Sequence, residues 1–377
     1  MQPPTTPHQP GFANIHLRGG IIKQLLALAL TSFTATANAQ SYAFNFLDAP
    51  GARYNSGADI NNANHVVGTS GNTHDPQAIL WNGLTPTVLA DTSVCCTYVE
   101  TSAAAINNAD QIAGTDTYRA VLWTNNKPAL LPALGSGQST AQGINDTGQV
   151  VGYTGGLSTP HATLWSNGTA TDLGTLGGGS TSYALDINNS GLVAGASERA
   201  GDNQLHATLW NKFTAIDLGT PSGSESNATA VNEAGQAVGY SAGRAVLWSG
   251  ASTSFLGGLG TRALDINNLS QIVGYTFDEF SPEAQPRATL WNGTQSTDLN
   301  SFLGQANKAA GWNLESANAI NDNGWITGTA FNNQTSERAA YLLSVVPAVP
   351  EPATAALTLA GLGVLGAFCR RRKSPSA

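Results

Sequence analysis

The sequence predicts an all-β fold, a seven-bladed β-propeller, on three observations. A unit of about 43 residues recurs seven times between residues 58 and 344, and a period of about 40–50 residues with four short strands is that of a propeller blade. Charged residues make up only 11% of the chain, whereas glycine contributes 42 residues, a balance typical of turn-rich all-β proteins. A strand that precedes the first unit, residues 42–48, can complete the last one.

Each unit is expected to contain four short strands. The first ends at an asparagine, and the second is a brief apolar run that ends in glycine, as in Val150-Val151-Gly152. The third reads Ala-x-Leu-Trp in six copies, and the fourth carries Thr-Asp-Leu, as at Asp172-Leu173. We expect each indole, which buries about 150–250 Å², to fill the space between blades. The asparagines are Asn61, Asn107, Asn145, Asn188, Asn232, Asn267 and Asn321, and the tryptophans are Trp81, Trp123, Trp165, Trp210, Trp248 and Trp291.

The fourth residue counted from each asparagine is predicted to close a tight turn between the first two strands. It is Gly, Asn or Asp in six copies, and these residues tolerate the positive φ that such a turn requires. Ser270 is the exception.

The N-terminal strand is predicted to close the ring of blades. The seventh copy reads Ala339-Ala340-Tyr341-Leu342 at its third strand and then runs into Pro347 without a fourth. Leu47 precedes Ala58 by the same number of residues as Leu173 precedes Ala184, so residues 42–48 fit as the missing strand and would hide its edge. An open β-solenoid is the alternative fold.

The third strand gives the repeats a resemblance to a known family. It reads His161-Ala162-Thr163 and His206-Ala207-Thr208, with Arg119, Arg244, Arg287 and Arg338 at the histidine position in four other copies and Gln77 in the first. The pattern over residues 42–344 resembles the HAF repeat of extracellular bacterial proteins, although the phenylalanine of His-Ala-Phe is absent. The resemblance implies an extracellular location and carries no assigned chemistry.

The N-terminus indicates export. Arg18 and Lys23 precede the apolar run of residues 25–30, and Ala37-Asn38-Ala39 matches a small-x-small cleavage site. We therefore predict a signal peptide over residues 1–39, the β-propeller over 40–346 and a C-terminal signal over 347–377.

The C-terminal signal has three parts. Pro350, Glu351 and Pro352 precede an apolar stretch, residues 353–369, which is predicted as a short transmembrane helix. The basic residues Arg370, Arg371 and Arg372 follow and favour the cytoplasmic side. This layout resembles the PEP-CTERM sorting signal of Gram-negative bacteria, which implies an exosortase-type transpeptidase as partner and passage through the inner membrane to the cell surface or extracellular matrix. The two prolines predict an extended segment before the helix, and a plain tail anchor is the alternative.

Several other functions find no support in the sequence. The net charge of −8 without a basic patch argues against a nucleic-acid partner. Cys95 and Cys96 are adjacent, which favours two free thiols, and they offer no metal spacing. No hydrolase, zinc-protease or phosphate-loop motif is present, and we expect no cofactor. Residues that recur in every blade are expected to be structural, the alternative being that the His/Arg position forms a basic ring suited to anionic sugars.

Ligand binding is expected in loops that only one blade has. Three loops are longer than their counterparts, at residues 93–98, 277–283 and 301–312. The second contains a candidate set that could hold a sugar by stacking and hydrogen bonds, or bind Ca²⁺, with a simple solvated loop as the alternative. Its members are Phe277, Asp278, Glu279, Phe280 and Glu283.

The leading hypothesis is an exported, non-enzymatic surface or matrix protein that binds exopolysaccharide or a surface partner. A secreted polysaccharide hydrolase or lyase on the same scaffold is the second. Two carboxylates about 5–10 Å apart in a cleft would favour the enzyme, whereas an aromatic or basic floor would favour binding.

Overall fold

The computed structural model describes residues 40–49, 51–72, 75–92, 100–135, 137–155, 159–221, 223, 225–277, 285–293 and 295–347. The predicted all-β class is confirmed, since strands β1 to β28 account for nearly all regular structure in these residues. Ser41–Val346 forms one compact unit. The predicted signal peptide, the transmembrane helix over 353–369 and the sorting residues lie outside the described residues.

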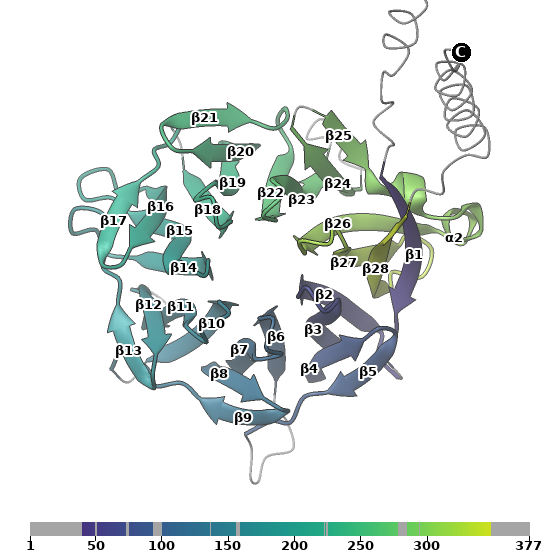
Figure 1. Ribbon diagram of the computed structural model, residues 1–377, viewed down its shortest axis with the longest axis horizontal. Coiled ribbons are helices and arrows are strands. Elements are labelled where there is room, and N and C mark those ends of the chain that lie inside the picture. Colours follow the sequence, from purple (N-terminus) through teal and green to yellow (C-terminus); the bar gives the residue numbers. More distant parts are fainter. Residues whose placement is uncertain are drawn as a thin grey trace, which may run out of the picture. The chain divides into compact units, whose positions relative to one another are not determined.

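The strands form seven four-stranded antiparallel units, here called units 1–7, arranged in a ring with the first strand of each nearest the centre (Figure 1). Units 2–6 are separate sheets, whereas units 7 and 1 are joined into one eight-stranded sheet by a single parallel bridge between Tyr54 and Arg338. Units 1–3 consist of β2 (Tyr54–Ile60), β3 (His65–Asn72), β4 (Asp75–Asn82) and β5 (Thr85–Val88); β6 (Thr101–Ile106), β7 (Ile112–Asp116), β8 (Arg119–Thr124) and β9 (Lys127–Leu130); and β10 (Gln138–Ile144), β11 (Val150–Gly155), β12 (His161–Ser166) and β13 (Thr169–Asp172). Units 4 and 5 consist of β14 (Ser182–Ile187), β15 (Leu192–Glu198), β16 (Leu205–Asn211) and β17 (Thr214–Asp217); and β18 (Ser226–Val231), β19 (Ala237–Ser241), β20 (Arg244–Ser249) and β21 (Ser252–Phe255).

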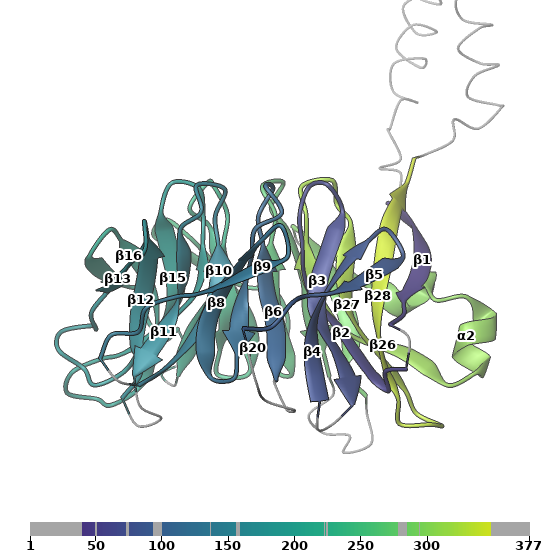
Figure 2. The ribbon, with the colours of Figure 1, turned by 90° about the horizontal axis from the view of Figure 1, so that it is seen from below.

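Unit 6 consists of β22 (Thr261–Ile266), β23 (Gln271–Thr276), β24 (Arg287–Asn292) and β25 (Gln295–Asp298), and unit 7 of β26 (Trp312–Ile320), β27 (Ile326–Asn332), β28 (Arg338–Val346) and β1 (Ser41–Leu47). A short 3-10 helix (Leu299–Phe302) and α2 (Gln305–Ala309) connect them. The side view shows the units standing next to one another around the ring (Figure 2). In the part of the chain that the structure describes, no helix is long and apolar enough to cross a membrane.

The N-terminal strand occupies the fourth position of unit 7. β1 pairs antiparallel with β28, with Leu47 opposite Ala340, and Leu47 is fully buried. The indole of Trp81 in unit 1 donates to the Asp48 carbonyl at 3.1 Å, just as Trp123 donates to Ala90 in the preceding unit. The pairing that the sequence predicts for residues 42–48 is therefore observed, and β1 supplies the same contacts as an ordinary fourth strand.

A cycle of hydrogen bonds joins all seven units. The side-chain amide of each motif asparagine donates to the main-chain carbonyl of the corresponding asparagine in the next unit, at 2.8–3.2 Å. The last of these bonds runs from Asn321 back to Asn61. The Oδ1 atom of each asparagine accepts backbone N–H groups within its own turn, as Asn61 does from Ala63 and His65. One residue type therefore closes each turn and links neighbouring units.

The predicted left-handed turn position is confirmed in every copy. Ser270, the exception in sequence, has φ of 59° like the others. The seven residues have φ between 56° and 82° and are Asn64, Asp110, Gly148, Gly191, Gly235, Ser270 and Gly324.

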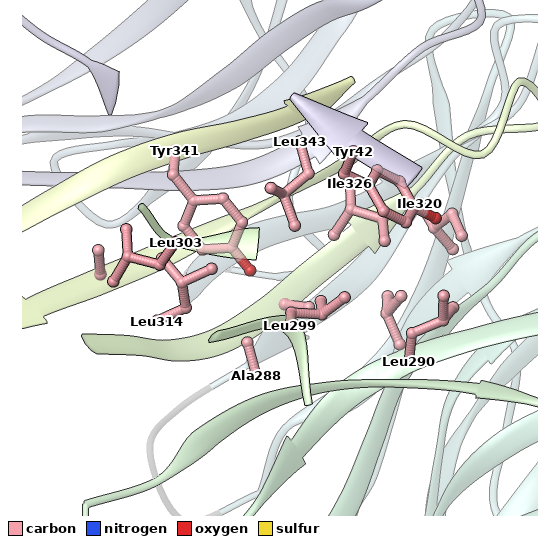
Figure 3. Packing of buried hydrophobic residues seen from close by; sticks show 13 residues of the cluster. Tyr42, Ala288, Leu290, Leu299, Leu303, Leu314, Ile320, Ile326, Tyr341 and Leu343 are labelled. Carbon is pink, nitrogen blue, oxygen red and sulfur yellow. The ribbon is translucent and has the colours of Figure 1, made fainter. Parts of the chain in front are cut away.

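The core lies between adjacent units, where all six motif tryptophans are at most 3% exposed. Figure 3 shows the cluster between units 6 and 7, in which Tyr42 of β1 and Leu299 of the connecting segment join Leu314 and Tyr341. Burial of aromatic and aliphatic side chains at each boundary stabilises the ring.

The predicted match of Ala339-Ala340-Tyr341-Leu342 to the Ala-x-Leu-Trp motif of the other units is wrong by one residue. Leu343 pairs with Ile326 and thus occupies the tryptophan position, and Ala339, not Arg338, occupies the His/Arg position. β28 is longer than the other third strands, and its extra first residue, Arg338, pairs with Phe331 beyond the repeat. The aromatic Tyr341 therefore stands where the other copies have a smaller residue such as Thr163.

Candidate functional site

A recurring pair of positions lies where two units meet, at the end of the ring opposite the asparagine turns. One residue comes from the second strand of a unit and the other from the first strand of the next. In three units this pair makes a direct contact. Tyr153 packs edge-on against Tyr183 with ring centroids 5.2 Å apart, and the guanidinium carbon of Arg262 lies 3.9 Å from the centre of the Tyr240 ring. At the boundary between units 7 and 1, the hydroxyls of Thr329 and Ser56 are 2.8 Å apart.

The boundary between units 6 and 7 departs from this pattern and forms a groove. Here the pair is Tyr275 and Ser316, so a large aromatic side chain is matched with a small one across the boundary. A cavity of about 440 Å³ lies there, hereafter the 6–7 groove. It is lined by Tyr275, Phe277, Gln285, Pro286, Glu315, Ser316 and Arg338.

The walls of the 6–7 groove are held by main-chain and ionic contacts. The N–H of Phe277 donates to the Gly260 carbonyl at 2.8 Å, and the amide of Asn313 donates to the Pro286 carbonyl at 2.8 Å. On the far wall, Arg338 donates to Glu315 at 3.0 Å. The first two contacts hold Phe277, where the predicted loop begins, and Pro286, which follows it in the chain.

The Arg338 side chain is fixed from a second side. Its guanidinium carbon lies 5.0 Å from the centre of the Phe331 ring, in cation–π range. An aromatic face beside fixed hydrogen-bonding groups is suited to a sugar ring.

Burial and a neighbouring arginine act in opposite directions on Tyr275. Burial raises the pKa of Tyr275, while the positive charge of Arg262 opposes that shift and Tyr240 adds to it. Arg262 in turn lies over the Tyr240 ring, 3.9 Å from guanidinium carbon to ring centre. Tyr240, Arg262, Tyr275 and Phe277 thus form a continuous row, since the rings of Tyr275 and Phe277 are 6.2 Å apart.

The sequence located one member of this site. Phe277 lines the groove, whereas its predicted companions Asp278, Glu279, Phe280 and Glu283 lie outside the described residues. Sequence reasoning missed Tyr275 because it belongs to a repeated strand rather than a long loop. The residue type gave no signal, since Tyr153 and Tyr240 occupy the same position in units 3 and 5.

The His/Arg position has a structural partner in several units. His161 contacts Asp172 of the neighbouring strand at 2.8 Å, and His206 contacts Asp217 at 3.1 Å. The N–H of Gly174 donates to the same Asp172 at 2.7 Å, so this aspartate also shapes the chain after the fourth strand. These contacts match the predicted hydrogen-bonding role.

The asparagine-turn end carries a second cycle of hydrogen bonds. The residue after each motif asparagine accepts, through its side chain, the N–H of the corresponding residue in the preceding unit, at 2.7–2.9 Å. Two neighbouring amides donate to Asp146, and although burial opposes the effect, these bonds lower the pKa of its carboxyl group. The seven residues are Asn62, Asn108, Asp146, Asn189, Glu233, Asn268 and Asp322.

Three carboxylates lie beneath this cycle, and the sequence did not single them out. Asp59, Asp186 and Asp265 each accept one N–H of their own unit at 2.7 Å and one of the next unit at 2.8 Å. Burial, reinforced by the negative charge of Asp59, raises the pKa of Asp265 to about 8. Burial likewise raises the pKa of Asp59 to about 6. Among the described residues, no group of three or more His, Cys, Asp or Glu side chains is placed to hold a metal ion.

Comparison with protein families gives two matches. Residues 175–346 match a family described as a protein of unknown function, DUF3466. Residues 348–373 match the PEP-CTERM protein-sorting motif, which implies an exported cell-surface protein that an exosortase recognises. No curated protein matches the chain.

The solved structures that resemble this one share little sequence with it. They include TolB from Acinetobacter baumannii, with 12% identity and a TM-score of 0.43 over 74% of this chain and 63% of that chain. A puromycin-hydrolyzing peptidase of Mycobacterium tuberculosis has 9% identity and a TM-score of 0.42, over 69% of this chain and 46% of that one. Dipeptidyl peptidase 4 of Porphyromonas gingivalis has 8% identity and a TM-score of 0.40, over 73% and 50%.

Proposed function

We propose that this protein is a non-enzymatic surface or matrix protein that binds a polysaccharide in the 6–7 groove after sorting by an exosortase. The observation that carries the proposal is the Tyr275 ring, which is matched with the small Ser316 across the boundary and lies beside Phe277 and the fixed Arg338–Glu315 pair. Aromatic faces supply the stacking surface for sugar rings, and the polar walls supply hydrogen bonds to hydroxyl groups.

The proposal places the groove on a seven-bladed β-propeller closed by its N-terminal strand. The register of β1 on β28 and the hydrogen bond from Asn321 back to Asn61 support this description. Likeness of the repeats to the HAF family, and passage through the inner membrane as a precursor, remain part of the proposal. The PEP-CTERM motif supports the export step.

Polysaccharide binding can be tested with a matched pair of tyrosine variants. The full chain would be expressed in an exosortase-bearing host, and its affinity measured for exopolysaccharide extracted from that host. Tyr275→Ala should weaken binding about tenfold, equivalent to about 1.4 kcal/mol. Tyr153→Ala, whose ring is covered by Tyr183, should leave the affinity unchanged.

Two results would overturn the proposal. Equal affinities of wild type and Tyr275→Ala would remove the groove as the binding site. Release of new sugar ends from the polymer during incubation would show that the protein cleaves it, and would favour the alternative function of a polysaccharide hydrolase or lyase.

A further inference from the structure

Arg262 is unlike every residue at the same position in the other units. It comes from β22, at the boundary between units 5 and 6, and its guanidinium lies over the Tyr240 ring. The corresponding residues are uncharged: Ser56, Ser102, Thr140, Tyr183, Asn227 and Ser316. A single positive charge is therefore placed in an otherwise neutral set of positions.

The guanidinium of Arg262 lies over one aromatic ring, that of Tyr240, instead of pairing with a carboxylate of the described residues. Within the described part of the chain, Arg199, Arg287 and Arg338 each form an ion pair with an acidic side chain, and Arg262 forms none there. It lies opposite Tyr275 in the register of β22 and β23. An arginine stacked on an aromatic face keeps its planar N–H edge directed at other partners, and that edge matches a carboxylate in two-point geometry.

The 6–7 groove has a neighbouring cavity. A second cavity of about 760 Å³ lies between units 7 and 1 and shares Arg338 as a common wall. Arg53 and Asn72 line its far side. The two cavities thus have one residue in common, and Arg262 lies next to the first of them, opposite its lining residue Tyr275.

We infer that the polysaccharide is a carboxylate-bearing one, and that Arg262 selects it by binding a sugar carboxylate while the sugar ring stacks on Tyr275. This inference rests on the proposed function and adds the class of ligand. Replacement of the arginine should therefore affect acidic polymers and leave neutral ones unaffected.

The test compares one polymer with its carboxyl-reduced form, so that only the charge differs. The full chain is titrated with polygalacturonate and with the same polymer after chemical reduction of its carboxylates. Wild type should bind the acidic form at least tenfold more tightly, and Arg262→Gln should bind both forms with the lower affinity. Arg262→Lys should fall between them, because a lysine keeps the charge but loses the planar two-point geometry.

Arg287→Gln is the matched control, because Arg287 is already paired with Asp298 at 3.6 Å; it should behave as wild type. Unfolding midpoints of all variants would show that they fold alike, and Arg262→Lys preserves the test if the glutamine variant does not fold.

Equal wild-type binding of the acidic and reduced polymers would overturn this inference and leave the proposed function intact. Equal loss of both polymers in Arg262→Gln would also overturn it, by showing a merely structural role. Failure to bind either polymer or the host exopolysaccharide would overturn both.

Discussion

Two buried tryptophans differ by one hydrogen bond, and this difference predicts unequal costs of substitution by phenylalanine. The indole of Trp165 donates to the Pro132 carbonyl at 2.6 Å, whereas the indole N–H of Trp210 finds no acceptor among the described residues. The contrast comes from the chain that follows the fourth strand of the preceding unit. In unit 2 the residue after Leu131 is Pro132, whose carbonyl accepts the bond. In unit 3 the residue after Leu173 is Gly174, where a φ of 75° turns the peptide differently.

The expected magnitudes follow from these contacts. Both indoles are nearly or fully buried, so the loss of packing is similar at the two sites and cancels in the comparison. Trp165→Phe also removes the bond to the carbonyl of the exposed Pro132 and should cost about 0.5–1.5 kcal/mol more than Trp210→Phe, which removes an N–H without an acceptor among the described residues. Truncation to alanine should cost about 3–5 kcal/mol at either site.

Urea unfolding followed by circular dichroism measures these free energies, provided that the dependence on urea is unchanged between variants. Equal costs for the two phenylalanine variants would refute the role given to the hydrogen bond. A cost below about 1 kcal/mol for either alanine variant would show that the indoles are not core residues.

Three further predictions concern the carboxylates, the cycle of asparagines and the sorting signal. Because the folded-state pKa values of Asp59 and Asp265 are raised to about 6 and about 8, these groups should lower the unfolding free energy as pH rises from about 4 to about 8. Asp265→Ala should flatten that slope in urea midpoints, and an unchanged slope would contradict the assignment. Asn321→Ala should lower the free energy of unfolding by about 2–4 kcal/mol, since it removes the bond to Asn61 and two bonds within its own turn. Asn323 is exposed, and Asn323→Ala should cost less than about 1 kcal/mol. Similar costs for the two variants would argue against a stabilising role of the cycle. Replacing Pro350-Glu351-Pro352 by three alanines should leave export intact and retain the uncleaved chain in the inner membrane, and a normal mature mass at the surface would reduce the motif to a linker.

Sequence reasoning predicted the features that each unit repeats. The turn at Asn61, the burial of Trp81 and the fit of Leu47 as part of a fourth strand all depend on short-range spacing that recurs along the chain. A signal repeated in every copy can be read even where one copy departs from it, as Ser270 does.

Features formed by two different units were not predictable in this way. The 6–7 groove arises because Tyr275 meets the small Ser316 of the next unit, and neither residue is unusual within its own strand. The raised pKa of Asp265 depends on burial and on the negative charge of Asp59, which comes from another unit. In both cases the property belongs to a contact that becomes visible only when the units are placed next to one another.

The most direct test of the account is a crystal structure of the exported protein bound to an oligosaccharide cut from the host exopolysaccharide. The account predicts a sugar ring stacked on Tyr275 within the 6–7 groove, next to Phe277 and Arg338. An oligosaccharide bound elsewhere, for example over Asn62 and Asp322 at the asparagine-turn end, with the 6–7 groove empty, would contradict it.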